Sequence, residues 1–236
     1  MPKVFISGAT GYLGRPLTQA LITAGCDVHA LTRPQSIRKL PIGCTPVPGN
    51  ALDASTFIGS VPAGSTFIHL TGVSHPSPAK AAEFRSIDQA SFQASLQCAR
   101  VARVSHFVYV SVAHPAPVMR EYVTVRRECE GQLERSGLNA TILRPWYILG
   151  PGHRWPYFLI PLYKLAQHVP TWRESTLRLG LVTHRQMLAA LVQATDRPSE
   201  GLACYDVPAI RAASFGAASA SPPVLSPPCH SSSPSA

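Results

Sequence analysis

The chain has 236 residues, 45% of them hydrophobic, and carries a formal net charge of +9, which suits one α/β domain with a small appendage. The positive charges are scattered and form no compact basic module, so we expect a phosphate-bearing ligand rather than a nucleic-acid partner. No apolar run reaches the ~18 residues of a membrane span, nothing near Met1 resembles a signal peptide, and the six cysteines show no metal-ligand spacing. We therefore expect a cytoplasmic protein with reduced thiols, no metal site and no transmembrane segment.

Residues 3–25 contain the most informative pattern. The apolar run 4–6 predicts a strand, and apolar residues at helical spacing after Gly14 predict a helix. Gly8, Gly11 and Gly14 lie at the turn between them. Glycines leave backbone N–H groups bare at a helix N-terminus, where a pyrophosphate can approach. The pattern predicts a dinucleotide site; a sharp turn without a ligand explains one glycine well and three poorly.

The stretch SGATGYLG at residues 7–14 resembles the TGATGxxG signature of the short-chain dehydrogenase/reductase superfamily. Ser7 stands where that signature has threonine, and it keeps a hydroxyl. The most similar branches are the extended and atypical ones, which include NAD-dependent epimerases and dehydratases and the nitrogen-metabolite-repressor-like proteins. The resemblance implies that Thr10, Tyr12 and Leu13 join the three glycines in holding the cofactor.

The end of the second predicted strand, residues 27–32, decides the choice of cofactor. An acidic residue at this place holds the ribose 2′-OH of NAD, whereas an arginine accommodates the 2′-phosphate of NADP. This chain has Arg33, with Arg38 and Lys39 close behind and no acid, and Arg15 adds charge from the first helix. We therefore expect NADP in preference to NAD. The alternative is a solvated basic loop.

A short third strand is expected at residues 44–47. The segment after it is similar to a GD-x-x-D segment of the family, whose first acid meets the adenine. Asn50 takes that place here, followed by Ala51, and an amide oxygen can still accept from the adenine amino group. Asp53 is expected to cap a helix through Ile58.

The fourth strand, residues 66–70, ends at a place that in a doubly wound sheet lies over the ligand crevice. By resemblance Leu70, Thr71 and Gly72 line the middle of the cofactor, while His69 alternates away from the crevice into the core. A long helix is expected over residues 79–102 and a fifth strand over residues 106–110.

The catalytic region departs from the family's pattern of a Ser or Thr after strand five and a Tyr-x-x-x-Lys on the next helix. The serine position falls near Val112, with Ser111 one residue early. Tyr122 is the expected acid/base, and Arg126 replaces the lysine. Arginine is not equivalent to lysine, but its charge can lower a tyrosine pKa and its fork can reach ribose hydroxyls. Glu130 is placed to pair with Arg126 along the helix.

A sixth strand is expected over residues 138–143, and the segment 144–152 after it resembles the RPxxxxGPG segment of the same branch. In that branch the loop after the proline, here Pro145, abuts the nicotinamide. Trp146, Trp155 and Tyr157 then either contact an amphipathic, anionic substrate or anchor the following helix. The remaining elements expected are a helix at residues 158–167, a strand at 177–182, a helix at 184–194 capped by Thr183, and a strand at 204–207.

Together these patterns predict a Rossmann-like doubly wound parallel sheet over residues 1–212, with a small C-terminal substrate subdomain at about 150–207 and a disordered Ser/Pro/Ala-rich tail at 213–236. Two functions remain open. One is an NADP-dependent oxidoreductase or isomerase of a small carbonyl or hydroxyl compound, in which Tyr122 and Arg126 are catalytic. The other is a non-catalytic dinucleotide-binding sensor or structural protein, in which Tyr122 is a surface tyrosine beside an ion pair.

Overall fold

The computed structural model describes residues 1–74, 76–115, 119–150 and 180–215. The expected helix at 158–167, the aromatic residues Trp155 and Tyr157 and nearly all of the expected tail therefore lie outside the described residues. Within the described ranges no helix is long and apolar enough to cross a membrane.

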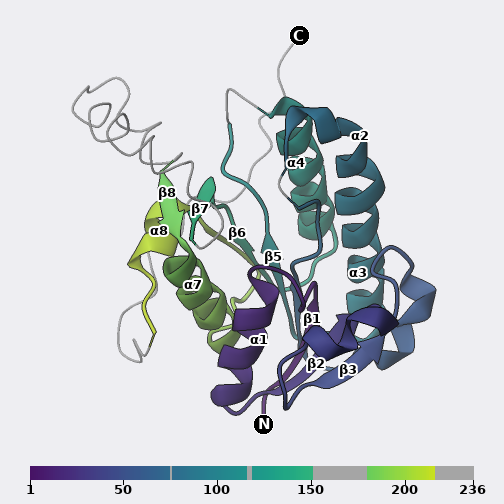
Figure 1. The fold of residues 1–236 in the computed structure, drawn as a ribbon. Helices are drawn as coiled ribbons and strands as arrows, with labels where there is room; N and C mark the ends of the chain where they lie inside the picture. Colours follow the sequence, from purple (N-terminus) through teal and green to yellow (C-terminus); the bar gives the residue numbers. More distant parts are fainter. Residues whose placement is uncertain (75, 116–118, 151–179, 216–236) are drawn as a thin grey trace.

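Seven parallel strands form the central sheet of the described structure, in the spatial order β3-β2-β1-β4-β5-β6-β9 (Figure 1). The order reverses on either side of β1, as in a doubly wound fold, and it confirms the predicted Rossmann-like sheet. Because both faces are covered by helices, the central strands are buried almost throughout, without alternation of buried and exposed residues. The strand bounds are β1 Lys3–Ser7, β2 Asp27–Thr32, β3 Thr45–Pro48, β4 Thr66–His69, β5 His106–Val110, β6 Ala140–Leu143 and β9 Leu202–Tyr205.

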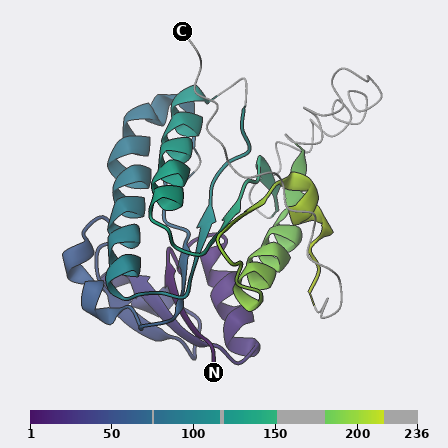
Figure 2. The same cartoon turned by 180° about the vertical axis from the view of Figure 1, so that it is seen from behind.

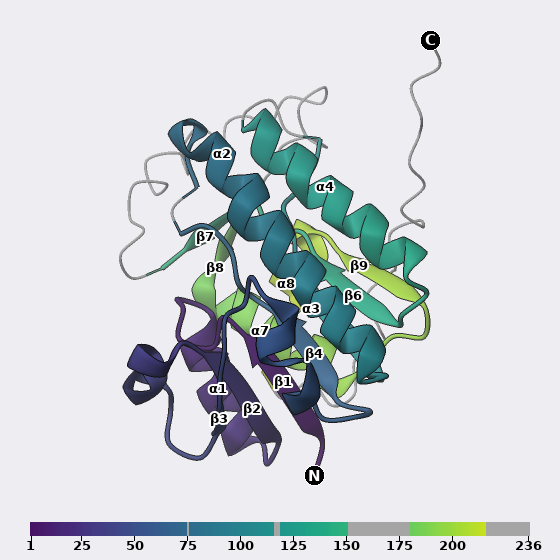
Figure 3. The same cartoon turned by 90° about the vertical axis from the view of Figure 1, so that its right-hand side faces the viewer.

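Helices cover the sheet in two layers. Helices α1 (Gly14–Thr23) and α7 (His184–Asp196) pack together on one face and bury a cluster that includes Leu17, Leu21 and Met187. Helices α3 (Ala90–Val101) and α4 (Arg120–Arg135) cover the other face over Phe67, Phe107 and Tyr109. Figure 2 shows the two layers from behind, and Figure 3 shows α3 and α4 lying alongside one another.

The long helix predicted over residues 79–102 is present but is not one regular α-helix. It consists of a 3-10 turn η4 (Pro78–Lys80), a short α2 (Ala81–Glu83), a π-helix η5 (Phe84–Gln89) and then α3. A π-helix has one extra residue in its turn, which is rare and changes the direction of the side chains that follow. In this chain it turns the carboxylate of Asp88 into the interior, where the residue is 1% exposed.

The segment after β3 forms two 3-10 turns, η2 (Ala54–Thr56) and η3 (Ile58–Ser60), instead of a helix through Ile58. Asp53 does cap the first turn, because its carboxylate accepts from the Ser55 backbone N–H. A further 3-10 helix, η1 (Pro34–Lys39), follows β2 and begins directly after Arg33.

The C-terminal elements differ in detail from the prediction. Residues Tyr147–Leu149, expected as loop, form β7, which pairs in parallel with β8 (Leu181–Thr183) as a separate two-stranded sheet. Thr183 caps α7 in a capping box with Gln186, as its position before the helix predicts. The last strand, β9, lies two residues earlier than expected, and the helix α8 (Val207–Ala212) follows it.

Candidate functional site

The glycine turn between β1 and α1 has a shape that only glycine allows. Gly8 has a φ of +82°, and a Cβ there would lie 2.7 Å from the carbonyl carbon of Leu70. A Cβ on Gly14 would overlap the carbonyl oxygen of Gly8. The turn is closed by the Gly11 N–H, which donates to the Gly8 carbonyl at 3.0 Å. The backbone is thus folded tightly at the start of α1, with no side chain at the three glycines.

The end of β4 lies beside this turn, and the ends of β5 and β6 follow along the same edge of the sheet. The Leu70 N–H donates to the Ser7 carbonyl at 3.0 Å, which places Thr71 and Gly72 next to the glycine turn. The Ser111 N–H donates to the Leu143 carbonyl at 2.8 Å, and the Ala113 N–H donates to the Pro145 carbonyl at 2.9 Å. The carboxyl edge of the sheet therefore brings together Gly8, Leu70, Thr71, Gly72, Ser111 and Pro145, as predicted from the positions of the strands.

Two hydroxyls at this edge are buried without a hydrogen bond in the described parts of the chain. They are Thr71 Oγ1 and Ser111 Oγ, and the Ser111 residue is 4% exposed. A buried hydroxyl without a partner is costly and uncommon in a folded protein. Together with the side-chain-free glycine turn, these hydroxyls fit a ligand that brings its own oxygens to the sheet edge. A dinucleotide of phosphates and riboses is such a ligand.

The far end of the edge holds the residues expected to select the cofactor. The Gly49 N–H donates to the Thr32 carbonyl at 3.0 Å, so Arg33 and Asn50 follow from adjacent strands. Arg33 is exposed. The Asn50 side-chain oxygen accepts from the Leu52 N–H at 3.1 Å, so this oxygen already holds the local turn. One of its lone pairs remains for a further donor.

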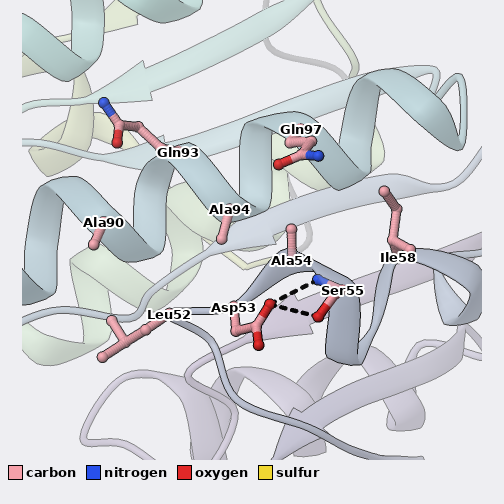
Figure 4. Close-up of a pocket in the computed structure, with 9 residues that line it drawn as sticks. All are labelled: Leu52, Asp53, Ala54, Ser55, Ile58, Ala90, Gln93, Ala94 and Gln97. Carbon is pink, nitrogen blue, oxygen red and sulfur yellow. Dashed lines mark hydrogen bonds between the residues drawn. The ribbon is translucent and has the colours of Figure 1, made fainter.

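An open pocket of about 520 Å³ borders this segment, between the η2 turn and α3 (Figure 4). Its acidic side chain, Asp53, accepts hydrogen bonds from the Ser55 N–H at 3.0 Å and the Ser55 hydroxyl at 2.7 Å. The rest of its lining is alanine, glutamine and aliphatic side chains. Both hydrogen bonds from Ser55 go to one oxygen of the Asp53 carboxylate, Oδ1.

Tyr122 and Arg126 lie on one face of α4, as predicted. The Arg126 guanidinium carbon lies 5.1 Å from the centroid of the Tyr122 ring. The same ring also packs against Phe84, with 5.0 Å between ring centroids. Tyr122 is therefore a partly buried ring between two elements rather than a surface tyrosine.

The acidic partner of Arg126 is Asp88 on the π-helix, which forms a buried ion pair with it. The Arg126 Nη1 donates to the Val110 carbonyl at 3.0 Å and to the Tyr109 hydroxyl at 3.3 Å. Glu130, expected as the partner, instead accepts two hydrogen bonds from Arg144 at 2.6 and 3.2 Å and contacts His114 Nε2 at 3.1 Å. Helical spacing alone predicted the wrong pair, because tertiary packing supplies a nearer acid.

Burial dominates the ionisation of this cluster. It raises the pKa of the Tyr122 phenol; Arg126 opposes the rise and Asp88 adds to it. The lower pKa that the lysine of the family produces is thus not found at this tyrosine. Burial likewise raises the pKa of Asp88, against the attraction of Arg126. His69 faces the core as predicted, and burial lowers its pKa to about 3, so it is neutral at physiological pH.

A family model described as NAD(P)H-binding matches residues 8–154, well over half of the chain. The chain belongs to this NAD(P)H-binding family. The match spans the glycine turn, the carboxyl edge of the sheet and α4, and it confirms the resemblance to the extended short-chain dehydrogenases/reductases.

Two curated relatives of this NAD(P)H-binding protein are named for reductions. The chain is 26% identical over 201 residues to a ceramide reductase of Caulobacter vibrioides, covering 84% of this chain and 62% of that protein. It is 25% identical over 170 residues to a 4-hydroxy-2-methyl-3-oxo-4-farnesyl-3,4-dihydroquinoline-1-oxide ketoreductase of Stigmatella aurantiaca, covering 63% of this chain and 51% of that protein. The chain thus spans between half and two thirds of the length of these relatives.

Solved structures share the fold of the NAD(P)H-binding chain. The Bordetella bronchiseptica enzyme WbmH in complex with NAD⁺ is 22% identical with a TM-score of 0.65, over 87% of this chain and 76% of that one. A UDP-N-acetylglucosamine 4-epimerase from Bacillus cereus is 18% identical with a TM-score of 0.64, over 87% and 79% of the two chains. At these identities the likeness concerns the Rossmann fold alone.

Sequence reasoning missed Asp88 and Tyr109, which complete the surroundings of Arg126. A signal for Asp88 was present, since it lies four residues after Phe84 and four before Phe92, on the buried face of the helix. A charged residue on an apolar face is rarely buried without a partner. The signal for Tyr109 is weaker, because an aromatic residue in a central strand is ordinary core.

Tyr12, predicted at the cofactor, has a second set of contacts in the NAD(P)H-binding protein. Its ring lies edge-on to the His184 ring, with 4.6 Å between centroids, and His184 Nε2 lies 3.1 Å from the Tyr12 carbonyl oxygen. A Cβ on Gly150 would overlap the Tyr12 hydroxyl. The glycine turn is therefore packed against the ends of β7 and the start of α7.

Proposed function

We propose that the chain is an NADP-dependent oxidoreductase or isomerase of a small carbonyl or hydroxyl compound. The observation that carries the proposal is the side-chain-free glycine turn beside the two unpartnered hydroxyls of Thr71 and Ser111. A bound nicotinamide supplies or accepts the hydride in such a reaction. We propose the glycine turn, Thr71 and Ser111 as groups that hold the dinucleotide, with Leu70, Gly72 and Pro145 lining it.

In this proposal the Tyr122 phenol is the acid/base group that exchanges a proton with the substrate oxygen. Arg126 supports it electrostatically and directs donors toward the ribose. Its Nε–H has no partner in the described residues, so one donor remains for this purpose. The names of the two reductase relatives support a reduction, and the +9 charge supports an anionic cofactor. A cytoplasmic location stays a prediction from the sequence.

Turnover tests the catalytic part of the proposal. We expect slow oxidation of NADPH with members of a carbonyl panel, because Val112 leaves no donor at the family's serine position and the Tyr122 pKa is raised. Tyr122→Phe should lower the rate by about a hundredfold, within the 10²–10⁴ range for general acid/base groups. Tyr205→Phe, which removes a hydroxyl on β9 outside the candidate site, is the control. An unchanged rate in Tyr122→Phe would remove Tyr122 from the mechanism.

The preference for NADP has its own test. Arg33 is exposed directly after β2, with no acid beside it. A charge-assisted hydrogen bond contributes about 1.5–3 kcal/mol, so Arg33→Ala should weaken NADP binding roughly ten- to a hundredfold and leave NAD binding nearly unchanged. Dissociation constants of both dinucleotides are measured by fluorescence, with Arg100→Ala as a distant arginine control. Equal affinities in the wild type would show that the chain prefers neither cofactor.

A non-catalytic dinucleotide sensor is the second candidate. The observation that favours it is the ion pair between Arg126 and Asp88, which engages the charge that the family uses to activate its tyrosine. Tight NADPH binding without turnover on the whole panel is the result expected for such a sensor. If the wild-type chain did not bind NADPH, both candidate functions would be contradicted.

A further inference from the structure

The π-helix places one acid, Asp88, at the base of the candidate site. Its carboxylate forms the ion pair with Arg126, and both of its oxygens lie 3.4 Å from the Val73 N–H. A Cβ on Gly72 would lie 2.6 Å from an Asp88 oxygen and 2.8 Å from Arg126 Nη2. The pair is therefore packed directly against the end of β4, at a position where an added Cβ would displace one of its side chains.

Arg126 is held from three directions. Asp88 binds Nη2 from the π-helix, and the Val110 carbonyl and the Tyr109 hydroxyl accept from Nη1 at the end of β5. The plane of the guanidinium also lies near the rings of Tyr109 and Tyr122, at 5.7 and 5.1 Å from their centroids. These contacts restrain the guanidinium at its place beside Tyr122.

We propose that Asp88 is a positioning residue that holds Arg126 against Gly72 and cancels its charge, so that Tyr122 lies beside a neutral pair rather than a free cation. The proposal rests on the role of Tyr122 given above, and it explains why that role is weak in this chain. A free cation at this distance favours the tyrosinate, whereas a carboxylate at the same guanidinium opposes it. The chain therefore has an arginine in place of the family's lysine, together with an acid that neutralises the charge of that arginine.

The charged and titratable groups around Tyr122 come from every element packed there. Arg126 and Cys129 lie on α4, and burial raises the pKa of the Cys129 thiol to about 11, so it is uncharged at neutral pH. Tyr109 on β5 is buried, and its pKa is raised well above the ordinary value by burial, so it is also neutral. His69 on β4 is neutral, and Asp88 with Glu83 comes from the helix segment before α3. Of these charges, Arg126 and Asp88 act on Tyr122, whereas Glu83 acts on Asp88.

Tyrosine labelled at the ζ carbon gives an NMR resonance whose pH titration reports the ionisation of each phenol, and Tyr122→Phe assigns the resonance of interest. The experiment uses the full chain without substrate. Asp88→Asn keeps the shape of the side chain and removes its charge, so we expect the Tyr122 pKa to fall by about 1 or more. Arg126→Gln removes the cation and leaves the acid, so we expect the pKa to rise. Glu134→Gln, which removes an exposed acid from the C-terminal part of α4, is the control and should leave the titration unchanged.

The opposite signs distinguish this role from a purely structural one. If the pair only held the fold together, both variants would loosen the packing and both would lower the Tyr122 pKa toward its ordinary value. A Tyr122 pKa that stays constant or rises in Asp88→Asn, or that falls in Arg126→Gln, overturns the proposal. If Asp88→Asn does not fold, the direction of the shift in Arg126→Gln decides alone. Because the titration needs no substrate, the pair can pass this test even if the carbonyl panel shows no turnover.

Discussion

Replacing Gly11 with valine is expected to weaken dinucleotide binding about ten- to a hundredfold while the chain stays folded. A Cβ on Gly11 would lie 3.2 Å from the Gly8 carbonyl oxygen, a tight contact that needs only a small shift of the backbone, and Gly11 has no positive φ, so the turn is strained less here than at Gly8 or Gly14. The branched side chain instead fills the space over the helix N-terminus where a pyrophosphate approaches. Steric overpacking of this kind costs about 1–3 kcal/mol, and 1.4 kcal/mol is tenfold in affinity.

The measurement is a fluorescence titration with NADPH, and circular dichroism verifies the fold. Gly59→Val is the matched control, because a Cβ on Gly59 would have no neighbour within 4 Å and Gly59 lies on η3, away from the glycine turn. Equal affinities of wild type and Gly11→Val, with both folded, would show that the dinucleotide does not lie over this turn.

Gly72→Ala is expected to lower the free energy of unfolding by about 1–3 kcal/mol. The new methyl group would lie 2.6 Å from the Asp88 carboxylate and 2.8 Å from the Arg126 guanidinium, so the ends of these two buried side chains must shift. Adding a methyl group to a packed interior typically costs about 1–3 kcal/mol, because side chains are forced from their preferred positions. Gly72 itself has no positive φ, so backbone strain contributes nothing to the effect.

Denaturant unfolding measures this change, with Gly59→Ala as the control for adding a methyl group in open space. Making the same substitution in the Asp88→Ala variant identifies the cause of the destabilisation. In Asp88→Ala the carboxylate that would meet the methyl group is gone, so adding Gly72→Ala should cost less than it does in the wild type. The same cost in both backgrounds would show that the destabilisation arises elsewhere.

The local sequence determined the parts of this protein that depend on neighbouring residues. The strands and α1 follow from short apolar runs and helical spacing, and the glycine turn follows from three glycines between them, because backbone conformation and amphipathic pattern act over a few residues. The match to the NAD(P)H-binding family and the parallel sheet confirm this reading. Thr183 before α7 is another such case, since a capping box is formed within four residues.

The tertiary structure alone decided which charges meet. Arg126 has Glu130 four residues away on its own helix, yet it pairs with Asp88, 38 residues away in sequence, because the π-helix turns that acid into the space beside Gly72. Glu130 instead accepts a hydrogen bond from Arg144, which follows the end of β6. Helical spacing gives the candidates for an ion pair, but the packing selects among them: Asp88 and Glu130 are both buried, and each pairs with the arginine that the fold brings beside it. For the same reason the sign of the Tyr122 pKa shift was set by packing and not by the Tyr-x-x-x-Arg pattern.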